Sequence, residues 1–439
     1  MTRLLNTPLS RRSLFGLGAG LAVASTLSGC AGASTTGGGD VTFFSTQFAP
    51  VEEKQRFEKI LADHVKDVRV GFNALPSAAD FNTQLKTQVD AGQVSIGVAA
   101  AIHGDLAPLG DYLEDLDDMV PDARAAGITD ELLELGKMGT STQKYIPWMQ
   151  ASYVVCANKK ALEWLPSGAD VNALTYDQFL QWADNANQAN GKPVFGLPAG
   201  PRGLYHRFFQ GYLIPSYTGA VVTRWTSADS VAGWSWMRDF WSNCNPASTN
   251  YEYMQEPLAR GEVLVGWDHV ARLVSAPQDN PDDWIMVPSP IGPKGLGYML
   301  IVAGMAIPRG GDREEAAKVI KALSAPAAQV EVLRQNAFFP VVETELPSDL
   351  PAPIKLEADA VAKQAASPQA LLALPPVGLG AKDGEFGQVF KDVFREICLQ
   401  GGDPQSVVTR YAANMQAVLD AAPVPCWAPD PPAPVCQVG

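Results

Sequence analysis

The chain has 439 residues, of which 46% are hydrophobic and 18% are charged. This composition excludes a disordered chain, and the length predicts about two lobes, because single cores stop growing at roughly 250–300 residues. Lys and Arg number 33 against 47 Asp and Glu, which gives a formal net charge of −14. A nucleic-acid-binding protein needs a basic face to neutralise phosphates, and an anionic lipid surface attracts the same charge, so neither is an expected partner of the protein body.

The N-terminal segment predicts an export signal. Residues 1–30 contain three arginines and no acidic residue, and an apolar stretch covers residues 13–27. A charged region followed by a short apolar region is typical of a signal peptide, and the stretch is shorter than the ~20 residues that a membrane-spanning helix needs. Arg11 and Arg12 precede the stretch in a run that resembles the twin-arginine signal, although the general export route also carries such pairs. Residues 1–29 are therefore predicted to be a signal peptide.

A lipid anchor is predicted directly after this signal. Residues 27–30 read Leu-Ser-Gly-Cys, which resembles a bacterial lipobox, in which the cysteine is acylated and becomes the mature N-terminus. Cys30 is the predicted lipidation site, and residues 30–40 form a tether of small, flexible residues. We therefore expect an exported protein that is held by its lipid on the outer face of the cytoplasmic membrane.

Five further cysteines follow Cys30, and an exported protein can form disulfides. An odd count leaves at least one thiol unpaired. Cys426 and Cys436 bracket a proline-rich segment of the tail, residues 422–439, and are the predicted pair. Cys156 follows two valines in an apolar run, which favours a buried thiol.

The body of the chain alternates strand and helix patterns. Residues 41–45 and 68–72 read as strands, and Phe57, Ile60 and Leu61 share one face of a helix between them. Residues 77–80 match a capping box for a second helix, and another apolar run covers residues 94–101. This order predicts a parallel sheet covered by helices.

The second half contains further helix signals. Residues 175–178 match a capping box, residues 312–315 place acids at a helix start, and a stripe of apolar residues runs from Phe386 to Ile397. Trp234, Trp236 and Trp241 sit at helical spacing, which favours core packing.

Catalytic and metal-binding motifs are missing from the sequence. The four histidines are far apart, and there is no HExxH motif, CxxC pair, GxSxG elbow or P-loop. We therefore predict no metal site, no cofactor and no enzymatic activity. A glycosidase remains an alternative, because its two carboxylates need only be close in space.

Several fragments occur in an order that resembles the extracellular solute-binding proteins of ABC importers, in particular the sugar-binding group that includes maltose- and glycerophosphodiester-binding proteins. The resemblance runs from residue 41 to about residue 345 and rests on residues 84–92, 106–116, 144–158, 258–267, 287–292 and 303–308. The sequence departs from the family pattern at residues 93–95 and at Ala157.

The resemblance implies an α/β, two-lobed periplasmic-binding-protein fold of type II. Each lobe is then a mixed, mainly parallel sheet flanked by helices, and crossing strands form the hinge. Lobe one is expected to contain residues 41–149 and 285–328, and lobe two residues 150–284 and 329–421.

The same resemblance implies capture of a solute without chemistry. A monomeric, lipid-anchored protein would bind a mono- or oligosaccharide between its lobes and deliver it to the permease subunits of an ABC importer. The alternatives are a glycerophosphodiester, polyol or peptide ligand in the same fold.

The candidate binding residues follow from sugar chemistry, because sugars stack on aromatic rings and pair their hydroxyls with polar side chains. Trp148 with Gln150, and Trp267 with Asp268 and Arg272, are the main candidates. The remaining candidates border the expected cleft: Ser45, Gln47, Phe48, His103, Asp105, Tyr205, His206, Tyr298 and Gly304. A phosphate ligand would instead require arginines, for which Arg202, Arg207 and Arg272 are available.

Overall fold

The computed structural model describes residues 41–376 and 378–439. The predicted signal peptide, Cys30 and the tether lie outside these residues. Within the two described ranges, no helix is both long and apolar enough to cross a membrane.

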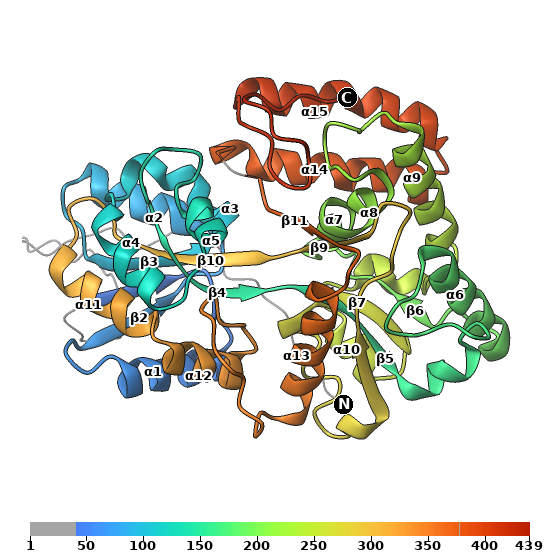
Figure 1. Cartoon of the computed structure of the whole chain (residues 1–439), viewed down its shortest axis with the longest axis horizontal. Coiled ribbons are helices and arrows are strands. Elements are labelled where there is room, and N and C mark those ends of the chain that lie inside the picture. The colour runs from blue at the N-terminus through green and yellow to red at the C-terminus, as the bar shows by residue number, and fades with distance from the viewer. Residues whose placement is uncertain (1–40, 377) are drawn as a thin grey trace, which may run out of the picture. The chain divides into compact units, whose positions relative to one another are not determined.

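Lobe one is built on a five-stranded sheet with the order β2-β1-β3-β10-β4 (Figure 1). Strand β1 (Val41–Ser45) pairs in parallel with β2 (Val70–Ala74) and β3 (Ile96–Ile102). Strand β10 (Ile301–Ala306) runs antiparallel to both β3 and β4 (Ile146–Ala151). The helices of this part are α1 (Val51–His64), α2 (Ala78–Asp90), α3 (His103–Leu106), α4 (Val120–Ala125), α5 (Asp130–Gly136), α11 (Arg313–Leu323) and α12 (Pro326–Asn336).

Lobe two is built on a four-stranded sheet with the order β6-β7-β5-β8. Strand β5 (Tyr153–Asn158) is antiparallel to β7 (Val265–His269) and β8 (Trp284–Val287), and β6 (Phe195–Gly196) is parallel to β7. The helices are α6 (Tyr176–Asn190), α7 (Tyr205–Phe208), α8 (Ile214–Thr218), α9 (Ala228–Trp241), α10 (Gln255–Ala259), α13 (Ala352–Ala365), α14 (Asp383–Phe394) and α15 (Pro404–Ala421).

The two-lobed α/β fold is the predicted one, and both sheets are mixed. The predicted majority of parallel pairs is not met, however, because antiparallel pairs equal the parallel ones in lobe one and outnumber them in lobe two. The antiparallel pairs arise where the chain crosses between lobes and returns, which reverses its direction relative to the neighbouring strand.

Two adjacent strand crossings form the hinge. Strand β4 continues into β5 through Ser152, and β9 (Leu296–Met299) continues into β10 through Leu300. The crossings are joined by pairing of Ile301 with Ala151 and by a hydrogen bond of 2.9 Å from the Ser152 hydroxyl to the Met299 carbonyl. Strand β11 (Ala370–Ala373) pairs in parallel with β9 beside them.

The strand pairing moves the predicted lobe boundaries. Strand β8 pairs with β5, so the chain returns to lobe one after residue 299 rather than at residue 285. Helix α12 packs against α1, so lobe one extends past residue 328 to Asn336. A strand belongs to the sheet that supplies its hydrogen-bond partners, and single-strand periodicity does not reveal those partners.

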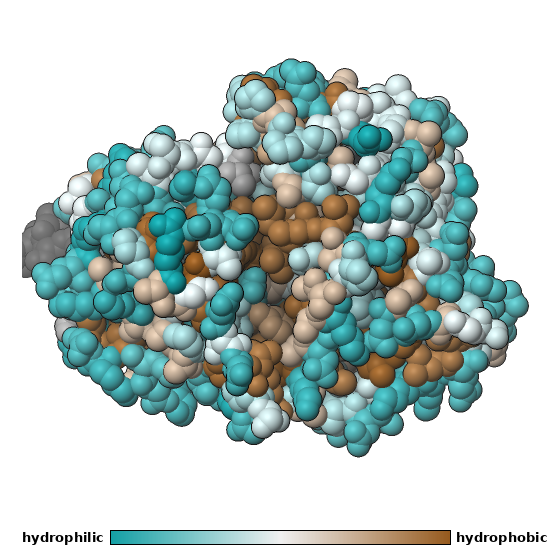
Figure 2. All heavy atoms as spheres, in the orientation of Figure 1, coloured by the Kyte–Doolittle hydropathy of each residue, from teal (hydrophilic) through white to brown (hydrophobic). Residues whose placement is uncertain are grey.

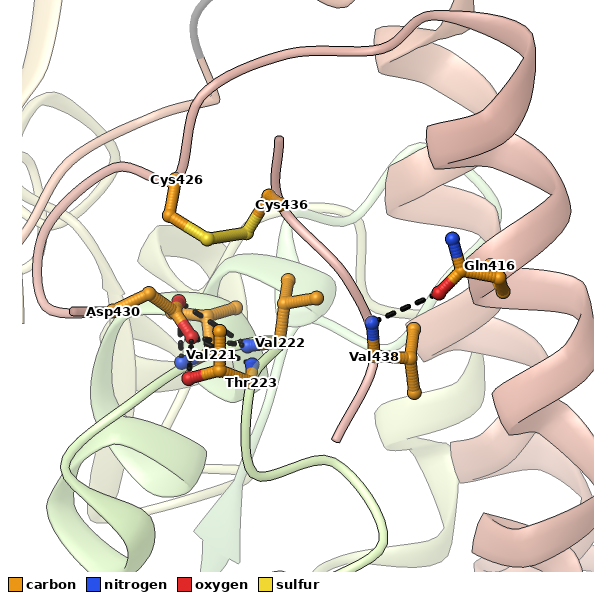
Figure 3. The surroundings of a disulfide bond; sticks show 8 residues. All are labelled: Val221, Val222, Thr223, Gln416, Cys426, Asp430, Cys436 and Val438. Carbon is orange, nitrogen blue, oxygen red and sulfur yellow. Dashed lines mark hydrogen bonds between the residues drawn. A yellow bond between two sulfur atoms is a disulfide. The ribbon is translucent and has the colours of Figure 1, made fainter. Parts of the chain in front are cut away.

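The C-terminal tail is fixed to lobe two (Figure 3). The predicted pair Cys426 and Cys436 forms a disulfide with an S–S distance of 2.09 Å. The carboxylate of Asp430 accepts hydrogen bonds from the backbone N–H groups of Val221, Val222 and Thr223 and from the Thr223 hydroxyl, at 2.7–3.0 Å. The tail therefore belongs to the folded body. The remaining described cysteines, Cys156, Cys244 and Cys398, are free.

Candidate functional site

The carboxyl ends of two parallel strands in lobe one bring polar residues together. Thr46 follows β1 and Asp105 lies in α3, directly after β3, and the Thr46 hydroxyl donates to the Asp105 carboxylate at 3.0 Å. In open α/β sheets, ligands bind outside this edge of the strands. The sequence predicted Asp105 here and missed Thr46, which lies between two predicted residues, Ser45 and Gln47.

His103 forms hydrogen bonds from this edge to residues that are distant in the sequence. Its ring is 2% exposed, and its two nitrogens lie 2.9 Å from the Tyr145 hydroxyl and 2.8 Å from the Pro376 carbonyl. A carbonyl only accepts, so Nε2 carries the proton and Nδ1 accepts from Tyr145. Burial lowers the pKa of His103, in agreement with this neutral ring. Both nitrogens are thus occupied by the protein, which favours a positioning role over direct ligand contact.

Lobe two contains two unpartnered hydrogen-bonding side chains beside Gly387 of α14. His206 lies in α7 and Gln210 in the following π-helical turn, Phe209–Leu213. His206 Nδ1 and Gln210 Nε2 are buried and have no partner among the described residues. Between them, Arg207 donates to Gln210 Oε1 at 3.0 Å. Burial, followed by the charges of Arg207, Lys391 and Arg272, lowers the pKa of His206, so its ring is neutral. π-Helical turns occur frequently at functional sites.

Charged groups of lobe two influence the pKa of Asp105, which lies on lobe one. The pKa of Asp105 is raised to about 6, mainly by loss of solvent and in smaller part by the nearby Asp383 carboxylate, while the hydrogen bond from Thr46 and the Arg207 guanidinium oppose the change. Asp383 begins α14, and a methyl group added at Gly104 would lie 2.7 Å from its carboxylate. Asp105 and Asp383 are thus two acids held near one arginine.

Arg272 adds a further unpartnered group. Its Nη1 atom is buried without a partner among the described residues, and its guanidinium lies over the Tyr253 ring at 4.4 Å. Asp268, by contrast, accepts from the backbone N–H groups of Met254 and His269 at 2.9 and 2.7 Å. Its predicted role as a ligand contact is not supported, because its carboxylate fixes the start of α10. We refer to the following residues as the interlobe polar cluster: Thr46, Asp105, His206, Arg207, Gln210, Arg272 and Asp383.

The two tryptophans predicted as sugar platforms are covered by their own lobes. Trp148 is 0% exposed and its ring contacts Phe43, Phe48 and Phe57. Trp267 is 1% exposed, stacks on Tyr153 at 4.7 Å and donates to the Ser289 hydroxyl. Neither ring face is available to a ligand in this structure. Aromatic residues on a buried strand face pack in the core, and the sequence pattern does not distinguish this from a binding role.

Gln150 lies outside the cluster, on the hinge. Its Nε2 donates to the Pro340 carbonyl at 2.7 Å, while its buried Oε1 has no partner among the described residues. It lines two adjoining hollows of about 210 and 380 Å³ that share Gln150, Leu300, Pro340 and Val342. Figure 2 shows hydrophobic residues gathered between the lobes, where Figure 1 draws β9, β10 and β11. This apolar groove offers few groups that could pair with a polar solute.

The other predicted residues have mainly structural contacts. Phe48 is 2% exposed with a left-handed φ of 59°, and the Ser45 hydroxyl accepts from the Gln47 backbone at 2.9 Å. A methyl group on Gly304 would lie 2.1 Å from the Tyr145 ring, so this glycine allows ring packing. Tyr205 packs on Phe209 and Phe394, and Tyr298 is half-buried in β9.

The cluster members that the sequence missed carry weak signals. Asp383 resembles an ordinary acid at a helix start, and Gln210 lies in an otherwise apolar helical run. Arg207 was considered only for a phosphate ligand. Among residues 41–376 and 378–439, no group of three His, Cys, Asp or Glu side chains could hold a metal ion.

Comparisons with known proteins agree on the fold. T. maritima MalE3, solved with maltose, has a TM-score of 0.70 at 19% identity and covers 86% of this chain and 100% of its own. UgpB from Mycobacterium tuberculosis, solved with glycerophosphocholine, has a TM-score of 0.66 at 17% identity and covers 88% of this chain and 99% of its own. The GacH receptor of Streptomyces glaucescens, also solved with acarbose, has a TM-score of 0.67 at 15% identity and covers 87% and 98%.

A search of the curated proteins found no matching relative. The model of the family described as bacterial extracellular solute-binding protein, however, matches residues 49–330, which is more than half of the chain. This match confirms the resemblance inferred from the sequence fragments. The chain therefore belongs to the bacterial extracellular solute-binding proteins.

Proposed function

We propose that this protein captures a carbohydrate at the interlobe polar cluster and delivers it to the permease of an ABC importer. The observation that carries the proposal is a set of buried nitrogens without protein partners, on His206, Gln210 and Arg272. Leaving a buried donor or acceptor unpaired costs roughly 1–3 kcal/mol. A ligand rich in hydroxyls removes this cost, because each hydroxyl both donates and accepts.

The cluster also contains acceptors for such a ligand. When ionised, Asp105 and Asp383 accept hydrogen bonds from sugar hydroxyls, and the Arg207 charge favours the ionised form of Asp105. The structures of MalE3 with maltose and of GacH with acarbose, which share the fold, support a carbohydrate as the ligand class. No step of this capture requires a cofactor.

Ligand binding would change the conformation of the protein by closing the two lobes. The lobes are joined by adjacent crossings at Ser152 and Leu300, and a ligand that contacts both lobes favours the closed form. We infer that the permease binds this closed form. The lipid on Cys30 would keep the exported body at the outer face of the membrane, as a monomer.

A glycerophosphodiester is the second candidate. Three cations lie at or near the cluster, since the pKa of His206 is lowered by the charges of Arg207, Lys391 and Arg272. Guanidinium groups bind phosphate well. UgpB, solved with glycerophosphocholine, has the same fold. Polyols and peptides remain in the test panel without a specific observation in their favour.

A glycosidase is the remaining rival, because Asp105 and Asp383 form a carboxyl pair. The family is one of solute binding and is typically not enzymatic. Incubation with oligosaccharides should therefore release no shorter sugar, and release that disappears in Asp105→Asn would overturn the proposal.

Thermal unfolding with a panel of sugars, glycerophosphodiesters, polyols and short peptides tests the ligand class. A ligand at 100 times its Kd stabilises the native state by ~2.7 kcal/mol. We expect stabilisation by carbohydrates that is lost in Gln210→Leu. Stabilisation by glycerophosphocholine alone would keep the capture mechanism and replace the ligand.

A further inference from the structure

The two adjoining hollows that share Gln150, Leu300, Pro340 and Val342 form one groove, which we call the hinge groove. Their volumes are about 210 and 380 Å³. The groove is lined by parts of both strand crossings and by residues 339–346, which lead from α12 of lobe one to α13 of lobe two. It shares no lining residue with the interlobe polar cluster, so it is a separate site.

Most of the side chains that line the hinge groove are apolar. They include Leu132 of α5, Val361 of α13 and Leu372 of β11, three elements far apart in the sequence. Leu346 also lines it and is 41% exposed, and Figure 2 shows hydrophobic residues at the surface where Figure 1 draws β11. Exposed apolar patches mark interaction sites, and hollows of this size fit small molecules.

One polar side chain of the hinge groove has an unused acceptor. The backbone of Gln150 exchanges hydrogen bonds of 2.8 and 2.7 Å with Phe339, and its Nε2 donates to the Pro340 carbonyl at 2.7 Å. Its Oε1 is buried and has no partner among the described residues. The amide is therefore held in one orientation, and only a donor such as an N–H or O–H group can pair with Oε1.

The charged side chains that line the hinge groove are both acidic. They are Glu131 and Glu343, and neither carboxylate has an ion pair within residues 41–376 and 378–439. No Lys, Arg or His lines either hollow. Opposite charges attract and like charges repel, more strongly where water is partly excluded, so the groove favours a cation and disfavours an anion.

We propose that the hinge groove binds a small hydrophobic amine. Its ammonium N–H donates to Gln150 Oε1, its charge is attracted by Glu131 and Glu343, and its apolar body packs against the hydrophobic wall. An alcohol supplies the donor without the charge, a quaternary ammonium supplies the charge without the donor, and a carboxylate supplies neither. This inference is independent of the proposed function, because it concerns a different site and a different class of ligand.

Four probes with the same apolar body separate the three features: phenylpropylamine, its trimethylammonium derivative, phenylpropanol and phenylpropionate. Ligand-observed NMR titrations of the purified protein at low salt measure the Kd of each probe. We expect the amine to bind most tightly, the alcohol and the trimethylammonium compound to bind about tenfold more weakly, and the carboxylate not to bind.

Two sets of variants then assign each feature to its residue. The double variant Glu131→Gln, Glu343→Gln should weaken binding of the amine about threefold to tenfold and leave the alcohol unchanged. Gln150→Leu should weaken both the amine and the alcohol about tenfold and leave the trimethylammonium compound unchanged. Glu134→Gln is the matched control, because Glu134 lies on the same helix as Glu131, pairs with Lys137 at 2.6 Å and does not line the groove.

Both glutamates are exposed, so the double variant keeps the test decisive if Gln150→Leu does not fold. Equal affinities for the amine, the alcohol and the carboxylate would overturn the proposal, as would no binding of the amine. Amine binding that neither set of variants changes would place the amine elsewhere. A dimer in light scattering that Leu346→Asp dissociates would assign the groove to a second copy of the chain and overturn the proposal as well.

Discussion

The two walls of the interlobe polar cluster differ in how their hydrogen bonds are used. On lobe one, Thr46 donates to Asp105, and both nitrogens of His103 are occupied by Tyr145 and Pro376. On the lobe-two side of the cluster, three buried nitrogens have no partner among the described residues: His206 Nδ1, Gln210 Nε2 and Arg272 Nη1. If the cluster binds the ligand as we propose, lobe one is organised before the ligand arrives, and the free hydrogen-bonding capacity for the ligand lies on lobe two.

The difference follows from the elements that carry each wall. The lobe-one residues lie in short connections at the ends of β1 and β3, where neighbouring loops satisfy one another. Two of the lobe-two residues, His206 and Gln210, project from α7 and a π-helical turn, whereas Arg272 lies in the segment that follows β7.

Removing the central cation of lobe two should have the largest effect. Arg207→Met removes the donor to Gln210 Oε1 and a positive charge that acts on Asp105. Loss of a hydrogen bond to a charged group costs roughly 1.5–3 kcal/mol, so we expect affinity to fall by about tenfold to a hundredfold. Titration calorimetry with the ligand from the thermal screen measures this change.

Arg202→Met is the matched control, because Arg202 is exposed and pairs with Glu252 at the surface. Exposed ion pairs contribute ~0–1 kcal/mol, so affinity should not change. Equal losses in both variants would show that the cluster is not the binding site.

The C-terminal tail contains a buried polar residue, Asp430, that is fully hydrogen-bonded, in contrast to the unpartnered residues of the cluster. Asp430 is 5% exposed, and its carboxylate accepts from three backbone N–H groups and one hydroxyl (Figure 3). Asp430→Ala leaves these donors unpaired, so the free energy of unfolding should fall by ~2–3 kcal/mol. Ligand affinity should stay the same, since the residue is not in the cluster. A loss of affinity without a loss of stability in urea unfolding would contradict this separation.

Glu357 is a buried residue outside the cluster, and we expect its unpartnered atoms to destabilise the protein without contacting a ligand. Its side chain is 0% exposed, neither carboxyl oxygen has a partner among the described residues, and burial raises its pKa well above the ordinary value. Because the native state holds this proton and the unfolded state releases it, the residue weakens stability as pH rises above about 4.5. Glu357→Leu should therefore stabilise the protein by ~1–2 kcal/mol at pH 7, with a smaller gain at pH 4.

The exposed Glu163 gives the control, since Glu163→Leu should not change stability at either pH. A drop in ligand affinity in Glu357→Leu would show that this carboxyl belongs to the binding machinery after all.

The sequence predicted the architecture well because the fold depends on local patterns. The predicted capping box at Thr175 forms, and at Ser77 the predicted N-cap forms without the reciprocal bond, since the side chain accepts from the backbone of Asp80 alone. The lobe boundaries depend on strand pairing between distant residues, such as β8 with β5, and periodicity carries no information about such pairing.

The site was predicted less well, for a physical reason. Asp105 and His206, two of the predicted residues, belong to the proposed cluster. Trp148 and Trp267 are buried in the cores, because an aromatic ring on a strand has the same sequence signal in a core as in a binding site. Asp383 lies beside Gly104 of the other lobe, and no local sequence pattern records such a contact.

The smallest expected effect is a dependence of ligand affinity on pH. This dependence tests whether lobe one contributes an ionised acceptor. The pKa of Asp105 is raised to about 6, mainly by loss of solvent. A sugar hydroxyl that donates to the carboxylate favours the ionised form, so affinity should rise with pH. About a tenth of the groups are ionised at pH 5 and about nine tenths at pH 7, which predicts a roughly tenfold increase.

Calorimetry of Asp105→Asn should give a flat profile over this range, because an amide does not titrate. Asp268, whose pKa is also raised to about 6, ionises in the same window, yet its carboxylate is already held by two backbone N–H groups. A slope that persists in Asp105→Asn and disappears in Asp268→Asn would assign the pH dependence to Asp268 and the neighbouring Arg272. The acceptor would then lie on lobe two with the donors, and the division of roles between the two walls would fail.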